Sequence, residues 1–168
     1  MVVARDRSSR RSRSSATMGT HIDGGMRMRT GLGVDDVADL LEQPLIAVLA
    51  TRRADDSIML SPVWFEWYQG GIDIWVPTIK GGKVGHVQRD PRVTVVVANS
   101  EWPYRGFELR GEATVSTKPD DFYGALRRTA LRYSGPEAAE RMVAEYAPGA
   151  VIRIEPGTVR AWDYEDEA

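Results

Sequence analysis

The chain has 168 residues, of which 42% are hydrophobic, so it is long enough to bury the core of one domain. Its formal net charge of −2 argues against a protein that mainly binds nucleic acid, because that role needs a strongly basic face. The absence of cysteine excludes thiol nucleophiles, disulfides, zinc–thiolate sites and iron–sulfur ligation, and it fits a cytoplasmic protein. No apolar run reaches about 18 residues, so we expect no membrane-spanning helix.

Residues 1–32 are predicted to be a disordered tail, and residues 33–168 one folded domain. The start of the tail alternates arginine with serine, and its few apolar residues show no periodicity. No apolar core follows Arg10 and Arg11, which excludes an export signal, and an organelle transit peptide matches less well because no amphipathic stripe is present. We therefore interpret this segment as a disordered or misassigned start. A structural or RNA-binding role for it is the weakest of the functions considered.

The folded part is predicted to open with a short helix and a buried strand. Val34, Val37 and Leu40 share one helical face. The segment 45–53 is almost continuously apolar, which is typical of a strand buried on both faces, and a turn over 54–57 follows it.

A hairpin is expected next, between strands at 58–68 and 72–77. Pro62 lies in the middle of the first of these strands and cannot donate a hydrogen bond to a ladder, so we expect strand pairing to be interrupted there. Trp64 would then be placed to stack against a planar ring. The alternative is a plain edge strand whose aromatic residues pack in the core or in a dimer interface.

The junction between the second hairpin strand and a helix at 84–89 is the predicted site. Thr78, Lys80 and Lys83 bring a hydroxyl and two ammonium groups to a helix start, where unpaired backbone N–H groups and the helix dipole favour an anion. Gly82 lets the backbone approach such a ligand closely. The alternative is a solvated loop with two ordinary surface lysines.

The remaining segments indicate a mainly β fold. We expect strands at 92–100 and 106–116, with Gly111 at a bulge or close backbone contact. Two helices should follow, up to about residues 133 and 146, and two final strands at 150–156 and 158–164. Six or seven short-linked strands favour a closed antiparallel β-barrel with peripheral helices over a parallel doubly wound sheet.

Familiar catalytic groups are missing from the folded part. His86 is its only histidine, and Ser61 precedes a proline rather than lying on a glycine-flanked elbow, so hydrolase chemistry is not expected. We predict no metal site, although a site made only of carboxylates is not excluded, and His86 is a weak candidate haem ligand. The reactive group should therefore come from a cofactor.

Four segments together carry a family resemblance: ALATRRADDS, LSPVWFEWYQGG, IDIWVPTIKGGKVGHVQRDPRVTVVV and PYRGFELRGEA. The most specific feature is Lys83 before the strand entry Arg-Asp-Pro-Arg-Val. From Val34 to its end, the sequence resembles the pyridoxamine phosphate oxidase-like split β-barrel superfamily, and more narrowly its actinobacterial flavin/deazaflavin oxidoreductases. The resemblance implies a homodimer with each cofactor in a groove between two barrels.

The resemblance also implies a set of cofactor-binding residues, while catalytic residues stay unassigned. The set is Thr51, Arg52, Arg53, Ser61, Pro62, Val63, Trp64, Thr78, Lys80, Gly82, Lys83 and His86. Two departures bear on the phosphate contact, because many relatives have a serine and often an arginine at Gly81 and Gly82, and commonly an asparagine at His86.

The expected cofactor is the deazaflavin coenzyme F420, with FMN as the alternative. Both combine a planar ring with an anion, and the basic residues around the junction favour the longer, more anionic deazaflavin. The reduced coenzyme would transfer a hydride to an electron-poor C=C or C=N bond of a small molecule, with solvent or Tyr104 supplying the proton. The competing readings are an FMN-dependent oxidase or reductase of the same fold and a non-catalytic flavin- or tetrapyrrole-binding protein.

Overall fold

The computed structural model describes residues 26–166. The strands are β1 (Met26–Leu32), β2 (Ala47–Arg52), β3 (Ile58–Val63), β4 (Glu66–Tyr68), β5 (Gly71–Val76), β6 (Arg92–Ala98), β7 (Arg105–Ser116) and β8 (Ala150–Asp166). The helices are the 3-10 helix η1 (Val34–Val37), α1 (Ala38–Glu42), α2 (Gly82–Arg89), α3 (Pro119–Ser134) and α4 (Pro136–Glu145).

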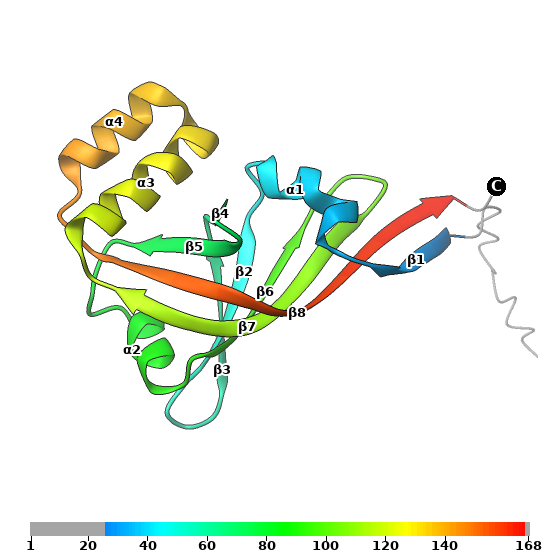
Figure 1. The fold of residues 1–168 in the computed structure, drawn as a ribbon, viewed down its shortest axis with the longest axis horizontal. Helices are drawn as coiled ribbons and strands as arrows, with labels where there is room; N and C mark the ends of the chain where they lie inside the picture. The colour runs from blue at the N-terminus through cyan, green and yellow to red at the C-terminus, as the bar shows by residue number, and fades with distance from the viewer. Residues whose placement is uncertain (1–25, 167–168) are drawn as a thin grey trace, which may run out of the picture.

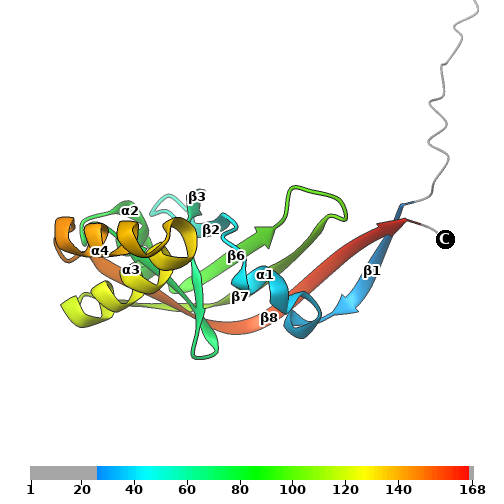
Figure 2. The same ribbon diagram turned by 90° about the horizontal axis from the view of Figure 1, so that it is seen from above.

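The strands form one antiparallel sheet in the order β3-β2-β6-β7-β8-β5-β4, with β1 paired to β8. Figure 1 shows this sheet curled into a half-barrel, with α3 and α4 lying together beside β5. At the other end of the molecule, β1 pairs with the last residues of β8, from Ala161 to Asp166 (Figures 1 and 2). This confirms the predicted mainly β split-barrel class. The described residues form eight strands instead of six or seven, and β3 and β4 end the sheet.

The core lies on the inner face of the curled sheet. Alternate residues of β2 and β6 are buried, including Leu49, Val95 and Val97, while Val48 is exposed. The prediction that β2 is buried on both faces is therefore wrong, because no layer formed by residues 26–166 covers the apolar side chains of its outer face. A second cluster joins the helices to the sheet through Phe122 and Leu126 of α3.

Two predicted boundaries at the chain ends are corrected. Residues 26–32 of the expected tail form β1, which pairs with β8, and residues 1–25 lie outside the described part. The two expected final strands are one strand, β8, because β7 pairs along almost all of it. The register shifts at Gly111, where a Cβ atom would lie 2.0 Å from the Glu155 carbonyl oxygen, which confirms the expected bulge and close backbone contact.

Pro62 does not interrupt strand pairing. It lies opposite Val48, and the β2–β3 ladder continues to the Ala47–Val63 pair. Because β3 is the end strand of the sheet, the missing N–H of Pro62 removes no bond that the sheet needs. The break comes two residues later, at Trp64 and Phe65, between β3 and β4.

Candidate functional site

Helix α2 starts with free backbone donors. Gly81 precedes the first turn with no side-chain cap, and its carbonyl oxygen accepts from the N–H groups of Val84 and Gly85 at 3.1 and 3.3 Å. The N–H groups of Gly82 and Lys83 belong to the first turn, so the helix itself cannot satisfy them. The helix begins two residues earlier than predicted, which places both groups in the helix dipole field.

The loop before α2 is short and tightly turned. The hydroxyl oxygen of Thr78 accepts from the Lys80 N–H at 3.2 Å, and its carbonyl oxygen accepts from the Gly81 N–H at 3.4 Å. Thr78, Lys80 and Gly82 are all exposed. This exposed corner presents donors and a positive charge to solvent, as an anion site requires.

A hollow of about 180 Å³ lies beside this corner. It is lined by Pro62, Val63, Trp64, Trp75, Val76, Pro77 and Lys83. The rings of Trp64 and Trp75 meet edge to face at 6.5 Å and 74°. Within the described residues, Lys83 has no ion-pair partner, and the buried indole Nε1 of Trp75 has no hydrogen-bond partner. Two indoles, an uncompensated ammonium group and a helix start suit a planar anionic ligand.

His86 is held against the end of β2. Its Nδ1 lies 3.0 Å from the Thr51 hydroxyl oxygen, and Thr51 is only 2% exposed. Burial, followed by the positive charges of Arg89 and Arg53, lowers the pKa of His86 below its ordinary value. An anion bound near these cations would offset their charge and so raise the pKa of His86.

The two arginines at the end of β2 already contact other groups of the chain. Arg52 pairs with Asp56 at 3.4 Å and with Asp90 at 3.5 Å. Arg53 donates to the Ser57 hydroxyl and the Ile58 carbonyl oxygen, both at 3.4 Å. Neither residue lines the hollow, and their predicted contact with a cofactor stays a prediction.

The structure thus brings part of the predicted set together. Pro62, Val63, Trp64 and Lys83 line one hollow, and Thr78, Lys80 and Gly82 form the adjacent corner. Thr51 and His86 form a separate pair, while Ser61 is 7% exposed and lies opposite Leu49 in the ladder. Tyr104 belongs to the loop between β6 and β7, and this loop lies away from α2 in both views (Figures 1 and 2), so within one chain Tyr104 is not placed to donate a proton at the hollow.

One site residue was missed by sequence reasoning. Tyr133, near the end of α3, stacks on Trp64 with ring centroids 4.7 Å apart and planes 12° apart. The sequence separates the two residues by a long stretch and offers no local pattern that would pair them.

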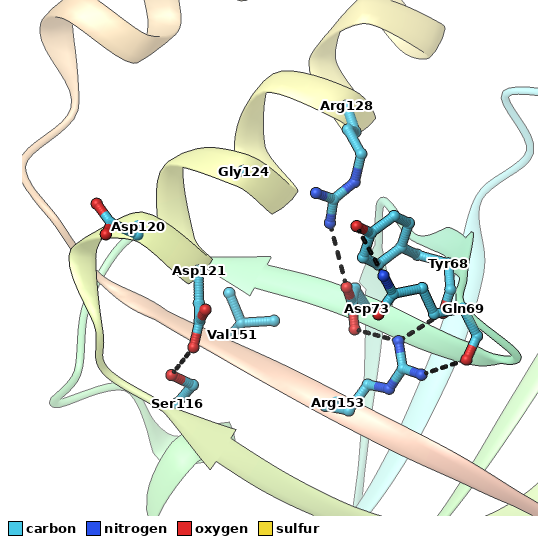
Figure 3. Close-up of a pocket in the computed structure, with 10 residues that line it drawn as sticks. All are labelled: Tyr68, Gln69, Asp73, Ser116, Asp120, Asp121, Gly124, Arg128, Val151 and Arg153. Atoms are coloured by element: carbon cyan, nitrogen blue, oxygen red, sulfur yellow. Dashed lines mark hydrogen bonds and ion pairs between the residues drawn. The ribbon is translucent and has the colours of Figure 1, made fainter.

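A larger hollow, of about 440 Å³, lies between α3 and strands β5 and β8 (Figure 3). Arg128 of α3 and Arg153 of β8 both point to the buried carboxylate of Asp73, at 3.3 and 3.1 Å. Arg128 also contacts Glu66 at 2.8 Å, and burial raises the pKa of that carboxyl although Arg128 opposes the shift. The strong charges here satisfy one another, which is typical of a tie between helix and sheet rather than a ligand site.

The described residues also bear on whether the chain could hold a metal ion or contain a membrane-spanning helix. Among them, no group of three or more histidine, aspartate or glutamate side chains is arranged to hold a metal ion. In the same part of the chain, no helix has both the length and the apolar character needed to cross a bilayer.

The family model described as "Pyridoxamine 5'-phosphate oxidase" matches residues 34–163. The chain belongs to this pyridoxamine 5'-phosphate oxidase family. The matched residues include those of the α2 corner and of the hollow, so the site described above lies within the part of the chain that matches the family. A comparison with curated proteins gave no match.

Solved structures of differently named proteins share this fold. A conserved hypothetical protein from Mycobacterium tuberculosis is 24% identical with a TM-score of 0.71, over 80% of this chain and 86% of that one. A structure described as an F420 reductase is 27% identical with a TM-score of 0.57, over 72% and 93%. The heme storage protein HutZ from Vibrio cholerae is 12% identical with a TM-score of 0.59, over 74% and 91%. Members with this pyridoxamine 5'-phosphate oxidase-like fold therefore include an enzyme and a storage protein.

Proposed function

We propose that this protein is an oxidoreductase that binds coenzyme F420 at the α2 corner and in the adjoining hollow. The observation that carries the proposal is the meeting of Lys83, which lacks an ion-pair partner in the described part of the chain, with two indoles at a helix start. Lys83 and the first N–H groups of α2 would hold the phosphate, and Trp64 would lie against the ring system. The F420 reductase of the same fold supports this choice of cofactor.

The protein's own residues would bind and orient rather than react. When bound, the reduced deazaflavin supplies a hydride for an electron-poor C=C or C=N bond of a small molecule. The proton comes from solvent, since Tyr104 lies away from the hollow of its own chain. Rate enhancement would then come mainly from proximity and ring orientation. Such a protein is expected in the cytoplasm.

We further propose that the working form is a homodimer. The hollow of about 180 Å³ is smaller than the roughly 300–1,000 Å³ that ligand pockets usually offer. A second chain over the open side would enlarge and close it. The apolar outer face of β2 and β3, where Val48 and Leu60 are 37% and 66% exposed, supplies a surface for that contact.

A parallel titration with F420 and with FMN tests the cofactor. We expect F420 to quench tryptophan emission of the wild-type protein, and Lys83→Ala to weaken its binding by about 10-fold or more, since a charge-assisted phosphate contact is lost. Lys118→Ala is the matched control, because Lys118 is an exposed lysine at the start of α3. If FMN binds more tightly than F420, FMN becomes the proposed cofactor. If Lys83→Ala binds the cofactor as tightly as the wild type does, the α2 corner is not the phosphate site.

Non-catalytic binding of a flavin or tetrapyrrole is the second candidate, supported by the fold shared with HutZ. It predicts tight binding without turnover of any reduced cofactor. For a tetrapyrrole it also predicts an absorption band that His86→Ala abolishes.

A further inference from the structure

Trp64 lies between two strands and is not itself part of the sheet. With Phe65, it fills the break between β3 and β4, so its main chain has no place in either ladder. Strand pairing therefore leaves the direction of its ring undetermined. Something else must fix the indole that lines the hollow.

Tyr133 of α3 supplies that contact. Its ring stacks on Trp64 at 4.7 Å and 12°, an offset parallel arrangement that restricts the indole to one plane. Its hydroxyl accepts from the Phe65 N–H at 3.3 Å and donates to the Leu45 carbonyl oxygen at 2.5 Å. One side chain thus satisfies a backbone donor freed by the break and joins the break to the residues before β2.

The neighbouring residue reinforces the same contact. Arg132 donates to the Leu41 carbonyl oxygen at 2.6 Å, and its guanidinium group lies over the rings of Phe65 and Tyr133 at 4.8 and 5.1 Å. Both residues come from the last turn of α3, so the helix end is anchored both to the break and to the segment that runs from α1 to β2. Movement of α3 would therefore move Trp64.

We infer that Tyr133 is a positioning residue that holds Trp64 as the wall of the cofactor hollow, which makes the end of α3 a determinant of affinity for a planar ligand. The inference rests on the proposed function, because it assigns Trp64 to the ring system of the cofactor. The two parts of Tyr133 have separable roles. Its ring sets the plane of the indole, and its hydroxyl holds the backbone of the break.

The experiment measures F420 and FMN affinity by calorimetry for wild type, Tyr133→Leu and Tyr133→Phe. Loss of the stacking ring in Tyr133→Leu should weaken binding of the preferred cofactor by about 10-fold, and Tyr133→Phe, which keeps the ring, by about 3-fold or less. Tyr68→Leu is the matched control. It removes another contact between α3 and the sheet, the Arg128 guanidinium over the Tyr68 ring at 3.7 Å, but leaves Trp64 untouched. Its affinity should equal that of the wild type.

A double-mutant cycle separates positioning from general loosening of the fold. In a Trp64→Leu background, Tyr133→Leu should cause no further loss of affinity, because the residue that it positions is gone. If Tyr133→Leu does not melt cooperatively, Tyr133→Met replaces it, since methionine fills similar space without a planar ring. Equal losses in both backgrounds, or wild-type affinity in a folded Tyr133→Leu, would overturn the inference. A wild-type protein that binds neither cofactor would instead overturn the proposed function.

Discussion

At the scale of single residues, the site depends on charges that have been left uncompensated. Lys83 lines the hollow without an ion-pair partner in the described part of the chain, whereas Arg52 and Arg53 at the end of β2 are engaged with acidic, hydroxyl and carbonyl groups. Forming an ion pair with a ligand costs less when no internal partner has to be displaced. Lys83 is therefore the cation that we expect to dominate binding.

His86 should report anion binding through its titration. Its pKa is lowered by burial and by Arg89 and Arg53, so the folded state disfavours the imidazolium, and His86 costs stability as the pH falls below its ordinary pKa of about 6.5. An anion at the α2 corner would offset the positive charges and raise this pKa. Binding would then take up a proton, so affinity should rise as the pH falls through the window between the free and bound pKa values.

NMR titration of the His86 ring protons, assigned with His86→Gln, measures this effect. We expect a pKa below about 6.5 in chloride and an upward shift when sulfate replaces chloride at equal ionic strength. The shift should shrink in Lys83→Ala. A His86 pKa that is insensitive to sulfate would show that the imidazole lies outside the field of the corner.

At the scale of elements, ion pairs from α3 and from β8 meet at one buried carboxylate. Asp73 of β5 is 7% exposed and receives Arg128 from α3 and Arg153 from β8. Its loss leaves two guanidinium groups with one fewer partner, although both are partly exposed and keep other contacts. The cost should be smaller than for a fully buried pair.

We therefore expect Asp73→Asn to lower the free energy of unfolding by about 2 kcal/mol in urea titrations. Glu140→Gln is the matched control. It removes the α4 partner of Arg127, which lies on α3 next to Arg128, and because this pair is exposed the effect should stay within about 0.5 kcal/mol. Cofactor affinity should be unchanged in Asp73→Asn. Weakened cofactor binding by a stable Asp73→Asn protein would instead make the hollow of Figure 3 part of the ligand site.

Local sequence patterns were sufficient to predict most helices and strands. Features that depend on partners far away in the sequence could not be predicted. The α2 corner was predicted because a strand period, a glycine pair and two lysines lie within a few residues of one another. Pro62 was misread because whether a strand lies at a sheet edge is decided by pairing elsewhere, and β1 was missed because its partner lies at the far end of β8. The Tyr133–Trp64 stack is likewise a tertiary contact with no local signature.

At the scale of the whole molecule, the outer face of β2 and β3 is an apolar surface that no other part of the described chain covers. Ile46, Val48, Ile58 and Leu60 are 49%, 37%, 53% and 66% exposed. Contiguous apolar patches of this kind mark interaction surfaces in soluble proteins. The inner face of the same strands forms the core, so one sheet both folds the chain and presents a contact surface.

Leu60→Asp tests whether a second copy covers this face. Light scattering after gel filtration should give twice the chain mass of 18.7 kDa for the wild type and the single mass for Leu60→Asp, because an unpaired carboxylate would be buried in the interface. Leu131→Asp is the control, since Leu131 is 52% exposed and belongs to α3 rather than to β2 or β3, and the variant should stay dimeric. If the second chain completes the hollow, Leu60→Asp should also lose cofactor affinity while keeping the folded half-barrel in circular dichroism. A monomeric wild type that binds cofactor at full stoichiometry would show that one chain is sufficient, and that the small hollow opens by movement within it.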